Sequence, residues 1–172
     1  MSLDTMHELF LEELKDLYSA EQQLVKALPK LAERVMTPSL RTAIESHLRE
    51  TEGHVTRLET CFSMLGEKAS GKKCKGMDGL LDEAGDIADE HGNDAVRDAG
   101  IIAAAQRLEH YEIAAYGCTI AFARTMGHQE VVTLLEETLS EEKAANEKLT
   151  ALAEEEVNQH AFAASTAAHG SH

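Results

Sequence analysis

The sequence has little proline, few aromatic residues and no tryptophan. Only two of its 172 residues are proline, and Phe, Trp and Tyr together make up 4%. Alanine, leucine and glutamate are abundant instead, and these residues lose little side-chain freedom in a helix. A hydrophobic fraction of 43% over this length allows one sizeable core, whereas the chain is too short for two domains. The composition therefore predicts a single all-α domain.

Basic residues, paired cysteines and long apolar runs are also scarce. With 16 Lys and Arg against 31 Asp and Glu, the net charge of −15 argues against a nucleic-acid or anionic-membrane partner. Cys61, Cys74 and Cys118 are widely spaced and odd in number, so we expect reduced thiols in a cytoplasmic protein, with an acidic periplasmic protein as the alternative. No apolar run is as long as a membrane span, and we expect neither a membrane segment nor a signal peptide.

Apolar residues recur at three- and four-residue steps along four long segments. They predict helices over about 3–35, 38–66, 95–126 and 129–158. A shorter helix is predicted over about 77–91, after a loop rich in glycine and lysine. The last residues, 161–172, are small and polar, so we expect a frayed tail after a bundle domain at 1–160.

The lengths of the connections predict the topology. Two or three residues separate the first long helix from the second, and the third from the fourth, so each pair should form an antiparallel hairpin. About 28 residues join the hairpins, enough to return along a helix of about 45 Å. We therefore predict an all-α, ferritin-like four-helix bundle with one long crossover and an extra short helix between helices 2 and 3.

Glutamates lie near the middle of every long helix. They are Glu21, Glu50, the pair Glu109 and Glu112, and the pair Glu141 and Glu142. Because the midpoints of antiparallel helices meet in one layer of a bundle, these carboxylates should converge. Acids that converge inside a core are costly to bury unless a cation lies among them. We therefore predict a site for a pair of metal ions.

Two observations rank the acids of the last long helix differently. Glu112 follows Glu21 by 91 residues. Glu141 follows Glu50 by the same number, which suggests that the hairpins are diverged copies around a two-fold-related site. The helical wheel instead directs Glu142 along the apolar stripe and Glu141 toward its edge. We rank Glu141 first and keep both as candidate ligands.

The second long helix adds histidines to this set. Glu50, His47 and His54 form one column at the flank of the apolar stripe, and one turn separates Glu50 from His54. We rank His54 ahead of His47 as a ligand, with an exposed or merely supporting histidine as the alternative. The usual di-iron or di-manganese layout has Glu-x-x-His on two helices, whereas Gly53 and Ala144 occupy those histidine positions here. Oxygen-rich ligation favours Fe or Mn over Zn or Cu(I).

Several strings resemble the YciF-like stress-response family of the ferritin-like superfamily. They are DLYSAEQQL (16–24), HLRET (47–51), KCKGMDGLLDEA (73–84), QRLEHYEIAAYG (106–117) and TLSEEKA (138–144), which span nearly the whole chain apart from the tail. The resemblance implies a four-helix fold with an extra short helix, a di-metal centre similar to that of rubrerythrin, and a homodimer. By position it implies as ligands Glu21, Glu50, Glu109, Glu112 and Glu141, with His54 left open.

Three functions follow as hypotheses. The first is a redox-active protein with two Fe ions, or alternatively Mn, that acts on peroxide, oxygen or ferrous iron as an oxidase or peroxidase-type oxidoreductase. The absence of rubredoxin-like cysteine pairs weakens its peroxidase form. The second is a structural or partner-binding bundle whose metal only stabilises the fold. The third, iron storage or DNA protection in a hollow cage, is disfavoured by the acidic charge and by the lack of a predicted fifth cage-building helix.

Overall fold

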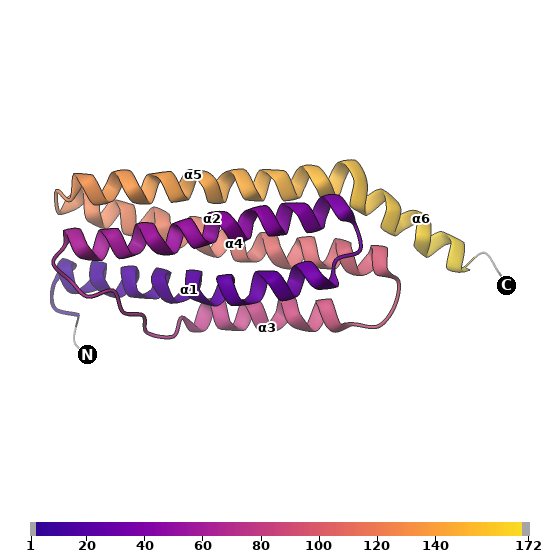
Figure 1. Cartoon of the computed structure of the whole chain (residues 1–172), viewed down its shortest axis with the longest axis horizontal. Coiled ribbons are helices and arrows are strands. Elements are labelled where there is room, and N and C mark those ends of the chain that lie inside the picture. The colour runs from indigo at the N-terminus through magenta and orange to yellow at the C-terminus, as the bar shows by residue number, and fades with distance from the viewer. Residues whose placement is uncertain (1–2, 170–172) are drawn as a thin grey trace.

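Four long helices lie side by side along the long axis of the molecule (Figure 1). In the computed structural model, which describes residues 3–169, they are α1 (Met6–Arg34), α2 (Pro38–Met64), α4 (Asp94–Thr125) and α5 (Gln129–Leu152). Short turns at 35–37 and 126–128 make hairpins of α1 with α2 and of α4 with α5. Gly127 in the second turn has a φ of 78°, a conformation that favours glycine. The two predicted hairpins are confirmed.

The crossover between the hairpins carries a fifth helix. The chain returns along the bundle between α2 and α4, and α3 (Lys75–Asp89) packs against α1 and α4 on the way (Figure 1). The predicted short helix is therefore confirmed, with both ends two residues earlier than expected. Cys74 is the N-cap of α3, and its backbone is held on α1 because its amide donates to Oγ of Ser19 at 2.9 Å. The crossover is thus fixed to the bundle at the start of α3.

The first helices begin with different kinds of cap. Thr5 and Glu8 form a capping box at the start of α1, in which each side chain accepts the backbone N–H of the other residue. The buried carboxylate of Asp98 on α4 caps α2, since it accepts the backbone amides of Met36 and Thr37 at 2.7 to 3.2 Å. Pro38 follows at a position where its missing amide does no harm. A local cap starts α1, whereas a long-range contact starts α2.

The apolar core is divided into two clusters. The first includes Leu24 and Leu28 of α1, Ile101 of α4 and Leu149 of α5. The second includes Phe10 and Leu14 of α1, Phe62 of α2, Tyr116 of α4 and Leu135 of α5. Along α2, α4 and α5 the predicted metal ligands lie between the residues of one cluster and those of the other, and on α1 Glu21 lies close to the boundary between the clusters. The fold therefore leaves a middle layer of the core for polar side chains.

The C-terminal part departs from a simple fourth helix. After α5 comes a π-helical segment, η1 (Ala153–Val157), and then α6 (Asn158–His169), which contacts α4 and projects beyond the bundle (Figure 1). Val157 and Ala161 are buried, so this part adds to the core. We expected a frayed tail over 161–172; residues 161–169 belong to α6, and 170–172 lie outside the described residues. The expected boundary at residue 160 falls within this helix.

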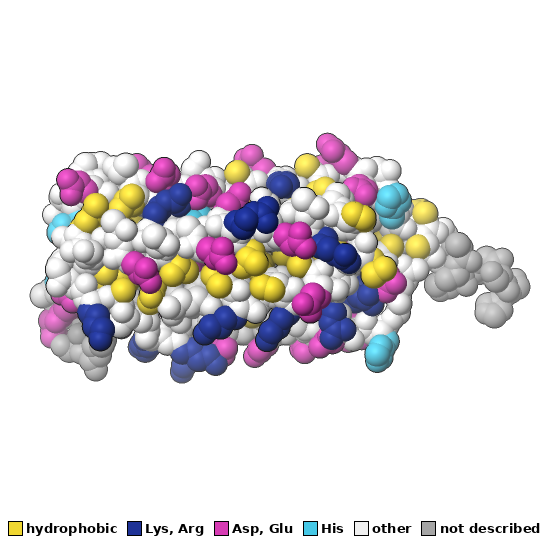
Figure 2. All heavy atoms as spheres, viewed as in Figure 1, with side chains coloured by type: hydrophobic (Ala, Val, Ile, Leu, Met, Phe, Trp, Pro, Cys, Tyr) yellow, Lys and Arg dark blue, Asp and Glu magenta, His cyan; other side chains and the backbone are white. Residues whose placement is uncertain are grey.

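Charged side chains of both signs cover the face shown in Figure 2. Lys and Arg gather along its lower edge, where α1 and α3 lie. Between α1 and α3, a groove is lined by Lys26, Lys30 and Arg34 together with Asp82 and Asp89. Arg34 forms an ion pair with Asp89 at 2.6 Å, so part of the negative charge is neutralised locally. Within residues 3–169, no helix has both the length and the hydropathy needed to cross a bilayer.

Candidate metal centre

Four carboxylates and two histidines meet in the layer between the two apolar clusters. The buried members are Glu21 of α1, His47 and His54 of α2, Glu109 and Glu112 of α4, and Glu142 of α5. None of them is more than 7% exposed, and Glu21, His54, Glu112 and Glu142 are fully buried. All four long helices contribute to the layer, as the convergence of their midpoints predicts. Six ionisable side chains are therefore removed from water in one place.

The first group within this layer contains one histidine and three acids. One ligand atom from each of His47, Glu109, Glu112 and Glu142 lies within 4.8 Å of all the others. Nε2 of His47 is 3.2 Å from Oε1 of Glu109 and 3.7 Å from Oε2 of Glu142. An ion at their centre would be within reach of α2, α4 and α5 at once.

The second group contains His54, Glu21 and Glu142, again with one ligand atom of each within 4.8 Å of the others. Nδ1 of His54 lies 2.9 Å from Oε1 of Glu142 and 3.3 Å from Oε1 of Glu21. Glu142 belongs to both groups and contributes a different oxygen to each histidine contact. It is therefore the residue best placed to bridge two ions.

Most of the inward-facing atoms in this layer lack a hydrogen-bond partner. Among the described residues, the unpaired buried atoms include both carboxylate oxygens of Glu112 and Glu142, one each of Glu21 and Glu109, Nε2 of His47 and Nδ1 of His54. Each unsatisfied buried group costs about 1–3 kcal/mol, and native proteins keep few of them. Carboxylate oxygens with imidazole nitrogens are a donor set that suits Fe²⁺ or Mn²⁺. The residues present thus fit a two-metal centre.

The inner acids differ in the direction of their pKa shifts. The pKa values of Glu109 and Glu112 lie well above the usual range because of burial first and the neighbouring carboxylates second, Glu142 foremost. Burial would raise the pKa of Glu142 too, but its contacts with His54, Glu109 and His47 outweigh burial and lower that pKa. Burial lowers the pKa of His54, but its contacts with Glu142 and Glu21 outweigh that effect and raise the pKa to about 10. The raised pKa values favour protons on His54, Glu109 and Glu112, and a bound cation would replace these protons.

Two of the predicted ligands lie at the edge of the layer. The Glu50 side chain is 43% exposed, and its Oε2 lies 3.3 Å from Nδ1 of His47. The Glu141 side chain is 35% exposed, and its two oxygens accept hydrogen bonds from Arg57 at 2.7 and 2.9 Å. Neither residue belongs to the two inner groups. On α5 the structure brings Glu142 into the layer, as the helical wheel suggested and the reverse of our ranking.

Two further contacts of this layer are absent from the sequence-based set. The buried hydroxyl of Tyr116 donates to Oε1 of Glu21 at 2.5 Å. Tyr116 lies one turn after Glu112 on the same face of α4, so helical spacing could have found it. Arg57 donates to Oγ1 of Thr138 at 2.9 Å as well as to Glu141. Arg57 is one of several arginines on α2, and its spacing in the sequence gave no reason to select it.

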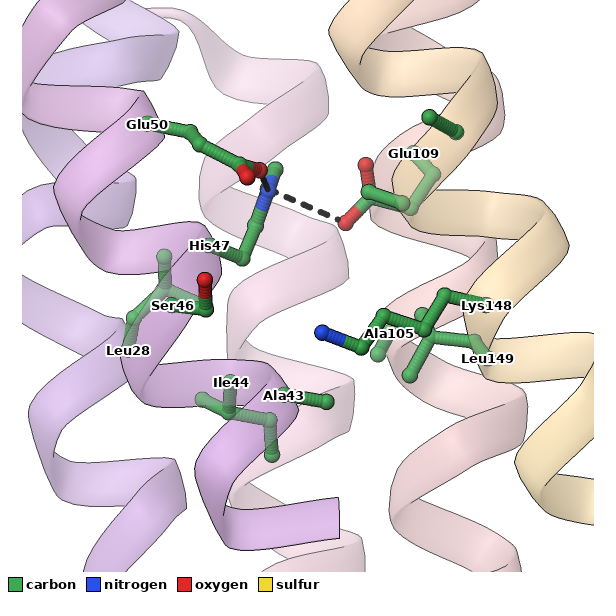
Figure 3. Close-up of a pocket in the computed structure, with 12 residues that line it drawn as sticks. Leu28, Ala43, Ile44, Ser46, His47, Glu50, Ala105, Glu109, Lys148 and Leu149 are labelled. Atoms are coloured by element: carbon green, nitrogen blue, oxygen red, sulfur yellow. Dashed lines mark hydrogen bonds and ion pairs between the residues drawn. The ribbon is translucent and has the colours of Figure 1, made fainter. Parts of the chain in front are cut away.

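A cavity of about 110 Å³ adjoins the first group. His47 of α2 and Glu109 of α4 point toward one another at its inner side, and Lys148 reaches across from α5 (Figure 3). The rest of its wall is mainly apolar and includes Leu28, Ala43, Ile44, Ala105 and Leu149. A space of this size holds a few water molecules or one small molecule. The layer is therefore buried but has a small chamber beside it.

Comparison with known proteins places the chain among bundles of this kind. A family described as "Domain of unknown function (DUF892)" matches residues 5–162. Protein YciF of Escherichia coli (strain K12) is 43% identical over 162 residues, which are 94% of this chain and 98% of that protein. The crystal structure of this E. coli stress protein matches the present structure with a TM-score of 0.87 and 42% identity. The match covers 91% of this chain and 99% of YciF.

Two other solved structures extend the comparison. YcfI of Rhodopseudomonas palustris, proposed to be a structural protein, is 47% identical with a TM-score of 0.84, over 87% of this chain and 97% of that one. A ferritin-like, diiron-carboxylate protein from Bacillus anthracis str. Ames is 21% identical with a TM-score of 0.65, over 88% and 99% of the two chains. This last likeness concerns the fold alone, and it confirms the predicted ferritin-like bundle.

Proposed function

Because the chain belongs to the DUF892 family, and so to the YciF-like proteins of the ferritin-like superfamily, we propose that it is a two-metal carboxylate protein of the stress response. We propose further that it reacts with peroxide, oxygen or ferrous iron. One observation carries the proposal, namely the layer of buried ligand atoms without hydrogen-bond partners between two apolar clusters. The stress role is supported by the description of the E. coli relative.

In this proposal each inner group holds one ion. His47, Glu109 and Glu112 would hold the first ion, and Glu21 and His54 the second, with Glu142 shared between them. Two Fe ions, or alternatively Mn, would supply electrons and polarise an O–O bond. The protein itself would keep the ligand side chains in position and exclude bulk water. The Tyr116 hydroxyl fixes one oxygen of Glu21, and the apolar clusters cover the layer on both sides.

The size of the chamber beside the layer supports the proposal of a small substrate. Its volume of about 110 Å³ and its apolar wall suit dioxygen or hydrogen peroxide better than an organic molecule of cofactor size. His47 and Glu109, two members of the first group, form part of the chamber wall (Figure 3). A molecule in the chamber would therefore reach the layer without crossing the rest of the core.

Metal analysis combined with a peroxide reaction tests this proposal. Protein purified without chelators should contain about two Fe or Mn ions per chain, and Glu112→Gln or Glu142→Gln should lose them. Glu147→Gln, an exposed acid on the same helix as Glu142, is the matched control and should keep them. Mixing the reduced, loaded protein with peroxide should change its optical spectrum. Wild-type protein that takes up no Fe or Mn would contradict the proposal.

A structural role is the second candidate, because the relative YcfI is proposed to be a structural protein. In that case the ions would only stabilise the bundle. Chelation should still lower the melting temperature, but peroxide and oxygen should leave the spectrum of the loaded protein unchanged. A metal-free variant that folds, such as Glu112→Gln, should then also restore the stress phenotype of a deletion strain. The two outcomes separate a redox protein from a scaffold.

We also propose a homodimer in the cytoplasm. The family resemblance supports the dimer, and the three unpaired cysteines Cys61, Cys74 and Cys118 support a reducing compartment. Light scattering should give about twice the chain mass of 18.8 kDa. A mass far above that of a dimer would favour a storage cage, and a mass equal to one chain would contradict the dimer.

A further inference from the structure

Each buried histidine of α2 lies between inner and outer carboxylates. His54 turns Nδ1 toward Glu21 and Glu142, at 3.3 and 2.9 Å. Its other nitrogen, Nε2, lies 2.8 Å from Oε2 of Glu141, on the outer side. The ring is fully buried; Nε2 is hydrogen-bonded to Glu141, whereas Nδ1 lies near the inner carboxylates without a hydrogen bond. Only Nδ1 faces the group of atoms that could share an ion.

We propose that Glu141 is a positioning residue and not a metal ligand. It accepts a hydrogen bond from the Nε2–H of His54 and so fixes the ring with Nδ1 turned toward the ion. The inference rests on the proposed two-metal centre and assigns a role within it. Histidines that bind metals commonly donate their other N–H to a carboxylate, which sets the tautomer and the ring orientation.

The contacts of Glu141 explain why it is suited to this role. Both of its oxygens are held by the guanidinium group of Arg57, at 2.7 and 2.9 Å, in a two-pronged ion pair. Arg57 is held in turn by Oγ1 of Thr138 at 2.9 Å and by Glu137 at 3.3 Å. To ligate an ion, Glu141 would have to leave both Arg57 and His54, whereas Glu142 already lies in the layer with both oxygens unpaired.

The second histidine shows a looser version of the same arrangement. His47 turns Nε2 toward Glu109 and Nδ1 toward Glu50, whose Oε2 lies 3.3 Å away. Glu50 is more exposed than Glu141, at 43% against 35% of the side chain. The two histidines should thus bind their ions through different nitrogens, Nδ1 in His54 and Nε2 in His47.

Affinity for Mn²⁺ in paired variants of Glu141 gives the first test. Glu141→Ala should weaken binding about 10- to 100-fold, the usual loss when such an outer partner is removed. Glu141→Gln should retain most of the affinity, because its amide oxygen can still accept the Nε2–H of His54. If Glu141 were a ligand, Gln would lose as much as Ala, since a neutral amide replaces a hard anion poorly. Equal losses would overturn the inference.

Glu137→Ala is the matched control for these variants. Glu137 lies one turn before Glu141 on α5 and also contacts Arg57, but its carboxylate is not among the ion-pair partners of His54. Its removal should leave Mn²⁺ affinity unchanged. A loss equal to that of Glu141→Ala would show that the charge around Arg57 matters and not the contact with His54, and would also overturn the inference.

The nitrogen that binds the ion gives a second test, which a purely structural role would not predict. In zinc-loaded, ¹⁵N-histidine-labelled protein, NMR should show His54 bound through Nδ1 with Nε2 protonated, and His47 bound through Nε2. The variants His54→Gln and His47→Gln assign the signals. Binding of His54 through Nε2 would overturn the inference. Should Glu141→Ala fail to fold, as judged by circular dichroism, Glu141→Gln and the wild-type spectrum still decide.

The two proposals fail in distinguishable ways. Wild-type protein that binds neither Mn²⁺ nor Zn²⁺ would remove the two-metal centre and this inference together. Wild-type protein that binds about two ions, combined with equal losses in Glu141→Gln and Glu141→Ala, would remove only the positioning role and make Glu141 a ligand.

Discussion

The apolar clusters at the two ends of the bundle and the polar layer between them are equally buried. They differ because the polar layer contains buried atoms that lack hydrogen-bond partners. Phe62 at one end is fully buried among apolar side chains, and burial of such a side chain is favourable by about 1.5–3 kcal/mol. Glu112 and Glu142 in the middle are just as inaccessible, yet their oxygens have no hydrogen-bond partner. The ends therefore stabilise a layer that would be unfavourable by itself. Three predictions test this difference, and a fourth concerns a site outside both regions.

The largest effect is expected from a cavity in one apolar end. Phe62→Ala should lower the free energy of unfolding by about 3–5 kcal/mol, because a large buried ring is lost and the site cannot fully collapse. Guanidinium denaturation followed by circular dichroism measures this loss. Phe162→Ala on α6, where the side chain is 73% exposed, is the control and should change stability by less than about 0.5 kcal/mol. Similar losses in both variants would contradict the comparison.

The next effect concerns the middle layer with and without metal. Mn²⁺ at about 100 times its dissociation constant should raise the free energy of unfolding by about 2.7 kcal/mol, since it binds the folded chain. Adding a chelator should reverse the gain. Glu142→Gln, which removes the residue shared by both groups, should abolish it. If the variant gained as much stability as the wild type, the ion would be bound elsewhere.

A smaller effect, of opposite sign to the first, should follow from removing an unpaired acid. Without metal, Glu112→Met should raise the free energy of unfolding by about 1–3 kcal/mol, because two unsatisfied oxygens are replaced by an apolar group of similar length. The same variant should no longer be stabilised by Mn²⁺. Glu147→Met at an exposed position is the control, expected to be near neutral. Destabilisation by Glu112→Met would mean that the layer is not unfavourable when empty.

The smallest effect is expected outside both kinds of layer, at the cap of α1. Backbone hydrogen bonds from Asp4 and Thr5 and the hydroxyl of Thr5 lower the pKa of Glu8 below its usual value of 4.5. A lowered pKa gives stability that is present above the unfolded pKa and is lost as the pH falls through the folded pKa. Glu8→Gln should therefore melt slightly below the wild type at about pH 6, and the difference should shrink toward about pH 4. A difference that grows as the pH falls would contradict this sign.

Most of the fold could be predicted because it depends on local patterns and on connection lengths. The short helix α3 lies within two residues of its predicted position at both ends. The C-terminal helix was not predicted, since residues 161–169 have no clear apolar periodicity. The C-terminal part is supported by tertiary contacts, because Val157 of η1 and Ala161 of α6 are buried and α6 packs against α4. Such contacts cannot be deduced from composition.

The site was partly predictable, and the repeat of 91 residues shows where prediction stops. Glu21 and Glu112, related by that repeat, are both fully buried. Glu50 and Glu141, related in the same way, are both partly exposed at the edge. Residues related by the repeat thus have similar burial, but the repeat does not predict which pair of residues faces the core. For Glu141 that depends on Arg57 and His54, which lie more than 80 residues away in the chain.

The π-helical segment at Ala153–Val157 has a consequence for how the protein can vary. A wide turn accommodates one additional residue, which rotates everything after it by about 100° relative to an uninterrupted α-helix. Glu142 lies about three turns upstream and keeps its orientation whatever happens beyond Leu152. Deleting one residue of this segment should therefore redirect the C-terminal arm while the ligand layer stays in place.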